Sequence, residues 1–254
     1  MAIMAQPIVI NDPADRFDLS YVFANNYAAL GKERNALVEM AQVAREIVPG
    51  VPCRTALVHA GEIVELVELL QGSKVRPEIV IDFPDGAGGT VTKAAQAHAA
   101  AEAGAIGGDL VINLHAVEAR NKKVILEELK AVSRELKEVK VIAQIPYLWQ
   151  FDRESIPWLL DLLPEGGIYC IKDWTTRVDN FLLPDGDVLD YEQQTRLTYI
   201  EYMAKFIADH QLPLTLKIAG RVTPENVKSF VNAGAVLIGT SYRKAPSLRE
   251  ALLR

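Results

Sequence analysis

The chain has 254 residues, of which 50% are hydrophobic and 24% are charged. This composition is that of a globular protein with a large core, and the length fits one α/β barrel domain. The net charge of −6 argues against broad electrostatic binding to nucleic acid or to an anionic membrane surface.

The first residues lack a positively charged start followed by an apolar block, so we expect no signal peptide. No apolar run has the length of a membrane span. The two cysteines, Cys53 and Cys170, lie in apolar runs without paired spacing, which predicts reduced thiols in the core. These features predict a cytoplasmic protein without a membrane segment.

Strand-like apolar runs alternate with helical patterns along the chain. The predicted strands are residues 17–22, 53–59, 78–86, 107–115, 140–148, 167–173, 214–220 and 235–241. The predicted helices begin near residue 33 and continue with 61–73, 90–104, 119–138, 152–166, 191–211, 223–234 and 247–254. The strands are near-continuous apolar runs, which is typical of parallel strands covered on both faces. In the helices the apolar residues fall on one face, as Ile125, Leu129 and Val132 do.

Eight strand–helix units in a row predict a closed (β/α)8 barrel, the TIM-barrel fold, formed by a single domain. The domain would span residues 1–254 with a short N-terminal extension over about residues 1–14. An open doubly wound sheet is the alternative, but no G-x-G-x-x-G motif follows an early strand. The longest loop, residues 175–190, follows the sixth strand, where it could form a lid or contact substrate.

Three ionisable residues occupy positions in apolar strands where a core residue would be expected. Asp109 begins "DLVINL", Lys172 closes "IYCIK", and Lys217 lies in "LTLKIAG". A single lysine at a strand end can simply lie at a rim or in a salt bridge. Two lysines on adjacent strands repel each other unless one amine gives up its proton.

A neutral lysine amine in a poorly solvated pocket is a nucleophile that can form a Schiff base with a carbonyl group. The iminium then withdraws electrons from the neighbouring carbon–carbon bond, and Asp109 could transfer protons directly or through a water. Lys172, Lys217 and Asp109 therefore predict an aldolase of the Schiff-base type. We expect it to need no cofactor, and scattered acids without EF-hand spacing give no reason to expect a metal.

The last two strands end in segments suited to phosphate. Barrels often bind phosphate with the loops after these strands, where backbone N–H groups and helix N-termini meet the anion. Glycine allows close backbone approach, hydroxyl residues donate hydrogen bonds, and arginines add charge. The residues with these properties are Gly220, Arg221, Gly239, Thr240, Ser241 and Arg243.

At these residues the sequence resembles the deoxyribose-phosphate aldolase family. The segments "DFPDGAGGTVTK", "DLVINL", "YCIKDWTTRV" and "LIGTS" carry the resemblance, which runs with gaps over about residues 78–241. It implies a barrel aldolase in which Lys172 is the Schiff-base lysine, Lys217 the neighbouring cation, and Asp109 the proton-relay carboxylate. It further implies that Arg177 lies near the substrate phosphate, that Asp18 organises the site, and that Ser20 hydrogen-bonds substrate.

The sequence departs from the family pattern at two places around the site. Asp173 and Trp174 follow the reactive lysine, where the family has small hydroxyl residues, and Gly220–Arg221 replaces a pair of glycines. A carboxylate next to Lys172 would favour the charged amine unless it points away, and the indole would narrow the pocket.

The predicted function is reversible cleavage of a carbon–carbon bond in a deoxy-sugar phosphate or a related aldehyde or ketone. Two alternatives stay open. One is a related lyase or thiolase-like enzyme acting on another phosphorylated ketone, and the other is a barrel that binds a sugar phosphate without turnover. The expected partner is therefore a small (phospho)sugar or aldehyde, with no nucleic acid or membrane, and the chain is expected to form a homodimer.

Overall fold

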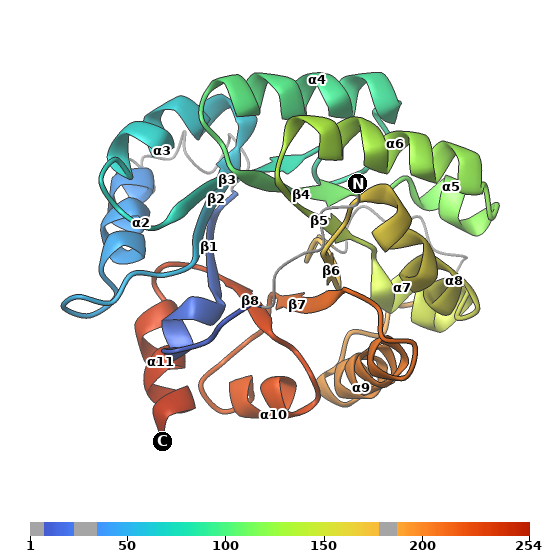
Figure 1. The fold of residues 1–254 in the computed structure, drawn as a ribbon. Coiled ribbons are helices and arrows are strands. Elements are labelled where there is room, and N and C mark those ends of the chain that lie inside the picture. Colours follow the sequence, from blue (N-terminus) through green and yellow to red (C-terminus); the bar gives the residue numbers. More distant parts are fainter. Residues whose placement is uncertain (1–7, 23–34, 178–186) are drawn as a thin grey trace.

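The computed structural model describes residues 8–22, 35–177 and 187–254, and these form a closed barrel of parallel strands in the order β1 to β8 (Figure 1). The strands are β1 (Phe17–Tyr21), β2 (Thr55–His59), β3 (Arg76–Ile81), β4 (Gly107–Val111), β5 (Glu138–Ile142), β6 (Cys170–Lys172), β7 (Thr215–Ala219) and β8 (Leu237–Thr240). The barrel closes where β1 pairs with β8, with Asp18 opposite Gly239. The predicted (β/α)8 fold is confirmed.

Helices surround the barrel and cover the outer faces of the strands (Figure 1). The α-helices are α2 (Ala36–Arg45), α3 (Ile63–Leu69), α4 (Gly89–Glu102), α5 (Leu114–Glu118), α6 (Lys122–Glu135), α7 (Ile145–Phe151), α8 (Ser155–Leu162), α9 (Gln193–Asp209), α10 (Val227–Asn232) and α11 (Ala245–Leu253). Short 3-10 helices are η1 (Pro13–Arg16), η2 (Ala60–Glu62) and η3 (Leu163–Gly166). In α6 the predicted apolar face is buried at Ile125, Leu129 and Val132.

The pairing register sets the two predicted lysines side by side. Lys172 on β6 lies opposite Lys217 on β7, so both side chains project on the same face of the sheet. Asp109 on β4 lies opposite Lys140 on β5. The interior of the barrel therefore receives charged side chains from several strands at once.

Several predicted strands are too long. The third was predicted to reach residue 86 but β3 ends at Ile81, and the fourth was predicted to reach residue 115 but β4 ends at Val111. The fifth strand shows the physical reason for such an error. Residues 143–148 were expected to continue the fifth strand, but β5 ends at Ile142 and α7 begins at Ile145. Gln144 adopts a left-handed conformation with φ of 52°, and Pro146 occupies the first turn of α7. Proline is favoured in a first helical turn, so this apolar run leaves the barrel as a helix.

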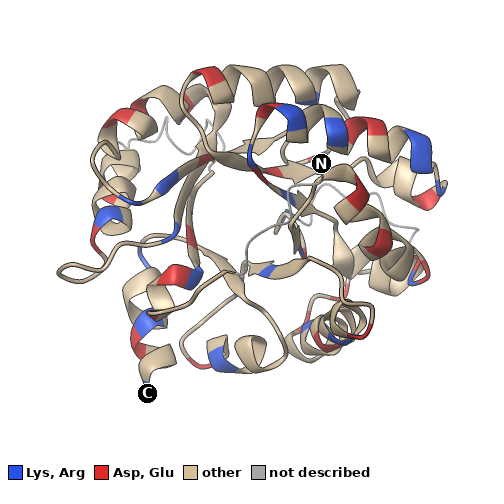
Figure 2. Ribbon diagram, in the orientation of Figure 1, with Lys and Arg blue, Asp and Glu red and all other residues tan. Residues whose placement is uncertain are grey.

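Charged residues lie on the outer helices and also on strands of the barrel wall (Figure 2). Both cysteines are free and buried, as expected. Within the described residues, no helix is both long enough and apolar enough to cross a membrane. The greater part of the predicted loop 175–190, residues 178–186, lies outside the described residues.

Candidate active site

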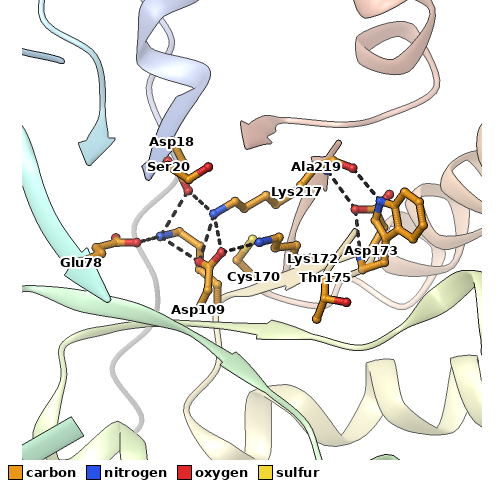
Figure 3. A network of polar contacts seen from close by, with 12 residues as sticks. Asp18, Ser20, Glu78, Asp109, Cys170, Lys172, Asp173, Thr175, Lys217 and Ala219 are labelled. Atoms are coloured by element: carbon orange, nitrogen blue, oxygen red, sulfur yellow. Dashed lines mark hydrogen bonds and ion pairs between the residues drawn. The ribbon is translucent and has the colours of Figure 1, made fainter. Parts of the chain in front are cut away.

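Six buried charged side chains meet inside the barrel, three carboxylates and three lysines (Figure 3). The odd-numbered strands contribute Asp18, Glu78, Lys140 and Lys217, and the even-numbered strands contribute Asp109 and Lys172. Alternate strands fill alternate layers in such barrels. Here ion pairs occupy part of the barrel interior, which therefore holds a charged cluster. We call these six residues the central cluster.

Lys140 lies at the base of the central cluster and contacts all three carboxylates. It pairs closely with Glu78, and its Nζ lies 3.3 Å from Asp18 Oδ2 and 3.8 Å from Asp109 Oδ1. Burial disfavours its charge, but the carboxylates outweigh burial and raise its pKa well above the usual value. The three carboxylates are close enough together to ligate a metal ion, but the Lys140 ammonium already supplies positive charge between them.

Lys217 is held in its charged form. Its Nζ lies 2.7 Å from Asp18 Oδ2 and 2.8 Å from Asp109 Oδ2. Burial acts to lower the pKa of Lys217, but Asp109 and Asp18 outweigh it, and the net pKa is raised. A side chain at Gly239 would place its Cβ 3.3 Å from Lys217 Cε, so this glycine leaves room for the lysine.

Lys172 differs from both other lysines because its pKa is lowered. Burial is the largest cause; the nearby Lys217 lowers the pKa further, while Asp109 acts in the opposite direction. Among the described residues, Lys172 is the one lysine of the central cluster that lines a cavity at the barrel mouth. It is therefore the amine best suited to meet a substrate in its neutral form.

Asp109 joins the two lysines. Its Oδ2 lies 3.0 Å from Lys172 Nζ and 2.8 Å from Lys217 Nζ, so the two amines cannot be farther apart than the sum of these distances. Burial acts to raise the pKa of Asp109, but Lys217, Lys172 and Lys140 together hold it far below its usual value. Asp109 therefore stays ionised at neutral pH and bridges the two amines.

Asp173 points away from Lys172, toward α9 (Figure 3). Its Oδ2 accepts hydrogen bonds from Arg196 Nη2 at 2.8 Å and from the Tyr199 hydroxyl at 3.1 Å. Its Oδ1 accepts the backbone N–H groups of Trp174 at 3.0 Å and Ala219 at 2.9 Å. The Asp173 carboxylate is thus paired with the guanidinium of Arg196, and Asp173 is only a minor cause that acts to raise the pKa of Lys172.

Trp174 also points away from the cavity, contrary to the expectation that it narrows the pocket. Its indole N–H donates to the Ala219 carbonyl at 2.6 Å, and its ring lies 5.2 Å from that of Tyr191. The side chain is buried and does not belong to the described lining of the cavity.

The cavity at the barrel mouth has a volume of about 290 Å³ and collects most of the predicted substrate residues. Its lining includes Ser20, Lys172, Arg177, Gly220, Arg221, Gly239, Thr240, Ser241 and Lys244. Asp18 lies deeper, in the central cluster, and Arg243 stacks on Tyr242 away from the lining. The charged residues among the described lining are all cations, so the cavity favours an anionic ligand.

The turn after β7 keeps a glycine-like backbone although it contains an arginine. Gly220 has a φ of 69° and Arg221 a φ of 53°. A Cβ at Gly220 would lie 2.3 Å from Thr176 Cγ2, so only glycine fits there. Arg221 occupies a conformation that costs a non-glycine residue about 1 kcal/mol or more. The shortened glycine motif thus preserves the shape of the turn, and the Arg221 guanidinium stacks on Tyr191 at 4.0 Å.

Arg177 crosses from the end of β6 toward the ends of β1 and β3. Its Nη2 donates to the Val22 carbonyl at 2.8 Å, and its guanidinium lies 5.8 Å from the Phe83 ring. These contacts with Val22 and Phe83 hold the guanidinium group in place, and Arg177 also lines the cavity.

Comparison with known proteins identifies the family. No family model matches the chain. A deoxyribose-phosphate aldolase from Dictyoglomus turgidum is 34% identical over 177 residues, which cover 68% of this chain and 72% of the relative. The chain belongs to the deoxyribose-phosphate aldolase family. A family member from Aquifex aeolicus is 33% identical over 171 residues, covering 66% of this chain and 69% of its own.

Solved structures share the barrel. The tetrameric deoxyribose phosphate aldolase from Aeropyrum pernix matches with a TM-score of 0.70 and 22% identity, over 94% of this chain and 91% of that one. An aldolase called QR15 matches with a TM-score of 0.73 and 24% identity, over 96% and 97% of the two chains. At such identities the likeness shows the fold alone.

Sequence reasoning missed several residues of the site. Lys140 and Glu78 lie in segments that read as ordinary strands with a polar start, yet both are fully buried. The signal was available, because a charged residue within an apolar run of a parallel sheet needs a partner inside the barrel. Arg196 and Lys244 carried no such signal, since each lies in a polar helical or loop segment.

Proposed function

We propose that this member of the family is a Schiff-base (class I) aldolase that reversibly cleaves a carbon–carbon bond in a deoxy-sugar phosphate or a closely related aldehyde. The observation that carries the proposal is the contrast among the three lysines of the central cluster. Lys172 faces the cavity with a lowered pKa, whereas Lys140 and Lys217 have raised pKa values. The names of the relatives, deoxyribose-phosphate aldolases, support the substrate class.

The reaction begins when the neutral Lys172 amine attacks the substrate carbonyl carbon. The carbinolamine loses water and becomes an iminium ion. A proton then leaves the hydroxyl group on the β-carbon, the bond between the α- and β-carbons breaks, and its electron pair moves into the iminium to give an enamine. The first aldehyde leaves. Protonation of the enamine carbon and hydrolysis by water release the second carbonyl product and regenerate Lys172.

Asp109 and Lys217 support these proton transfers in the proposal. Asp109 is too acidic to hold a proton for long, so it suits the role of orienting Lys172 and a relaying water. Lys217 opposes the protonation of Lys172 and is itself held by Asp18. Ser20 lines the cavity from β1, where its hydroxyl can bind a substrate hydroxyl.

The anionic end of the substrate is assigned to the β7–β8 side of the cavity. The turn Gly220–Arg221 and the segment Gly239–Ser241 offer backbone N–H groups, and Ser241 and Thr240 add hydroxyls. Arg177, Arg221 and Lys244 supply positive charge. A phosphate dianion matches this set of donors.

The two alternatives predict different outcomes. A lyase or thiolase-like enzyme would act on another phosphorylated ketone, and a binding barrel would take up sugar phosphates without turnover. The main reason for the binding barrel is weakened, because Arg196 pairs with the Asp173 carboxylate. The homodimer and the cytoplasmic location remain predictions. Light scattering of the purified protein would give its oligomeric state.

Borohydride trapping tests the proposed function. The enzyme is incubated with deoxyribose 5-phosphate, reduced with borohydride and digested for peptide mass spectrometry. We expect an adduct on Lys172 and none in Lys172→Ala, while Lys205→Ala, which changes an exposed lysine on α9, traps as the unchanged enzyme does. An adduct on another lysine, or turnover by Lys172→Ala, would contradict the assignment.

A further inference from the structure

Two departures from the family pattern contact each other in the structure. Asp173 and Trp174 replace small hydroxyl residues after the reactive lysine, and Gly220–Arg221 replaces a glycine pair. The side chains of Asp173 and Trp174 form hydrogen bonds with the backbone of Ala219, the residue before Gly220. The departures therefore form one structural unit, although 45 residues separate Trp174 from Ala219 in the chain.

The hydrogen bonds converge on the residues that begin the turn. Asp173 Oδ1 accepts the Ala219 N–H at 2.9 Å, and the Trp174 indole N–H donates to the Ala219 carbonyl at 2.6 Å. Arg196 donates from Nη2 to the Ala219 carbonyl at 3.0 Å and from Nη1 to the Gly220 carbonyl at 2.8 Å. The backbone is thus held on both sides of the peptide bond before Gly220.

Arg196 connects this backbone to Asp173. The same Nη2 that reaches the Ala219 carbonyl also lies 2.8 Å from Asp173 Oδ2. Arg196 is 1% exposed and Asp173 is 1% exposed, so both ends of the ion pair are shielded from water. A planar guanidinium can bind a carboxylate and two carbonyls at once, which the ammonium of lysine cannot do with the same geometry.

The held turn carries a non-glycine residue in the left-handed region. Arg221, with a φ of 53°, stays in this conformation only where its surroundings determine it. The hydrogen bonds to residues 219 and 220 hold the entry to the turn, and Asn226 Nδ2 donates to the Arg221 carbonyl at 3.1 Å on its other side. Both Gly220 and Arg221 line the cavity next to Ser241 and Lys244.

We propose that Asp173, Trp174 and Arg196 are positioning residues that hold the Gly220–Arg221 turn in the shape that binds the phosphate group of the substrate. The inference rests on the proposed function for the identity of the ligand. In this proposal Asp173, the residue after Lys172, helps to bind the phosphate end of the substrate and acts by way of Arg196 on α9. Arg196→Lys keeps a cation opposite Asp173, so we expect the reaction of the Lys172 amine with a small aldehyde to change little in that variant.

Arg196→Lys is the principal variant, because it keeps a cation for Asp173 but loses the fork that reaches both carbonyls. Arg120→Lys is the matched control, since Arg120 forms a two-point pair with Asp152 at 3.1 Å and 3.1 Å and does not line the cavity. The readouts are inhibition by inorganic phosphate, KM and kcat for deoxyribose 5-phosphate, and the same constants for deoxyribose.

We expect Arg196→Lys to weaken phosphate inhibition about tenfold and to raise KM for the phosphorylated sugar by a similar factor. The constants for deoxyribose and the borohydride trapping of acetaldehyde on Lys172 should change less than about twofold. Arg120→Lys should leave all of these constants unchanged. Unchanged phosphate inhibition, or an equal loss of kcat with both sugars, would overturn the proposal.

Trp174→Phe tests the proposal if Arg196→Lys fails to fold. It removes the single indole N–H bond to Ala219 and keeps the aromatic ring beside Tyr191. It should weaken phosphate inhibition by about threefold without changing trapping, and unchanged inhibition would overturn the proposal. Inorganic phosphate reports on the turn without any chemistry at Lys172. A failure of trapping in the unchanged enzyme would therefore contradict the proposed function, and the clamp would then be judged by direct binding of inorganic phosphate to the unchanged protein and to the variants, measured by calorimetry.

Discussion

Replacing Lys217 by methionine should raise the pKa of Lys172 and slow the enzyme at neutral pH. Methionine keeps the length and the apolar stem of the lysine but removes its charge. Lys172 then loses the cation that opposes its protonation, and Asp109 is left with more of its negative charge facing Lys172. Both effects favour the charged, non-nucleophilic form of the amine.

The size of the effect follows from the geometry. Both amines contact Asp109 Oδ2, at 3.0 Å and 2.8 Å. Two unit charges about 6 Å apart repel by about 3 kcal/mol at an effective dielectric constant of about 20. One pKa unit corresponds to about 1.4 kcal/mol, so the pKa of Lys172 should rise by about 2 units.

The assay is the pH dependence of kcat/KM for deoxyribose 5-phosphate, which reports the ionisation of the free enzyme. Activity requires the neutral amine, so it falls as pH drops through the pKa of Lys172. The acid limb of the profile should move about 2 pH units upward in Lys217→Met. At pH values below the limb, kcat/KM should fall about 100-fold, and at high pH it should return to the value of the unchanged enzyme. Lys205→Met, an exposed substitution, should not move the limb. A limb that stays in place, or moves to lower pH, would refute the electrostatic role of Lys217.

Two further predictions concern the barrel interior and the mouth. Burial raises the pKa of Glu78 to about 7, although Lys140 opposes the shift, and Glu78 Oε1 has no hydrogen-bond partner among the described residues. A carboxyl group with a raised pKa stabilises the fold below its unfolded pKa and loses that contribution as pH rises through about 7. The free energy of unfolding, measured in urea, should therefore fall between pH 5 and pH 8 by more in the unchanged protein than in Glu78→Gln. The difference between the two decreases should be at most about 3 kcal/mol. Curves of unfolding free energy against pH that run parallel in the two proteins would contradict this prediction. Gly220→Ala should weaken phosphate inhibition at least about tenfold, because the new methyl group would lie 2.3 Å from Thr176 Cγ2. Gly61→Ala is the control, since a Cβ at Gly61 has no neighbour within 4 Å. An unchanged inhibition constant in Gly220→Ala would contradict the assigned anion site.

The barrel could be predicted because its signal is repeated along the chain. Each strand is an apolar run and each helix has one apolar face, so errors at single boundaries do not change the count of units. The end of the fifth strand could not be predicted. Its apolar run continues past Ile142, and only the left-handed Gln144 and the placement of Pro146 in a first helical turn separate strand from helix. Such a backbone choice has no periodic signature.

The pairing of Lys172 with Lys217 could be predicted for a similar reason. Parallel neighbours in register bring Lys172 and Lys217 to the same height, and charge repulsion supplies the chemistry. The direction of Asp173 could not be read from its position, because it depends on Arg196 and Tyr199 of α9, which lie more than 20 residues later in the chain. Lys140 was overlooked because its partners come from three other strands.

The most direct measurement is an NMR titration of the Lys172 amine in protein labelled at the lysine side chains, with Lys172→Arg used to assign the signal. The central claim predicts that Lys172 titrates at a pH below 10.5, its ordinary value, and that its midpoint moves upward in Lys217→Met. A midpoint at or above the ordinary lysine value in the unchanged enzyme would contradict the claim that burial and a neighbouring cation keep this amine ready to react.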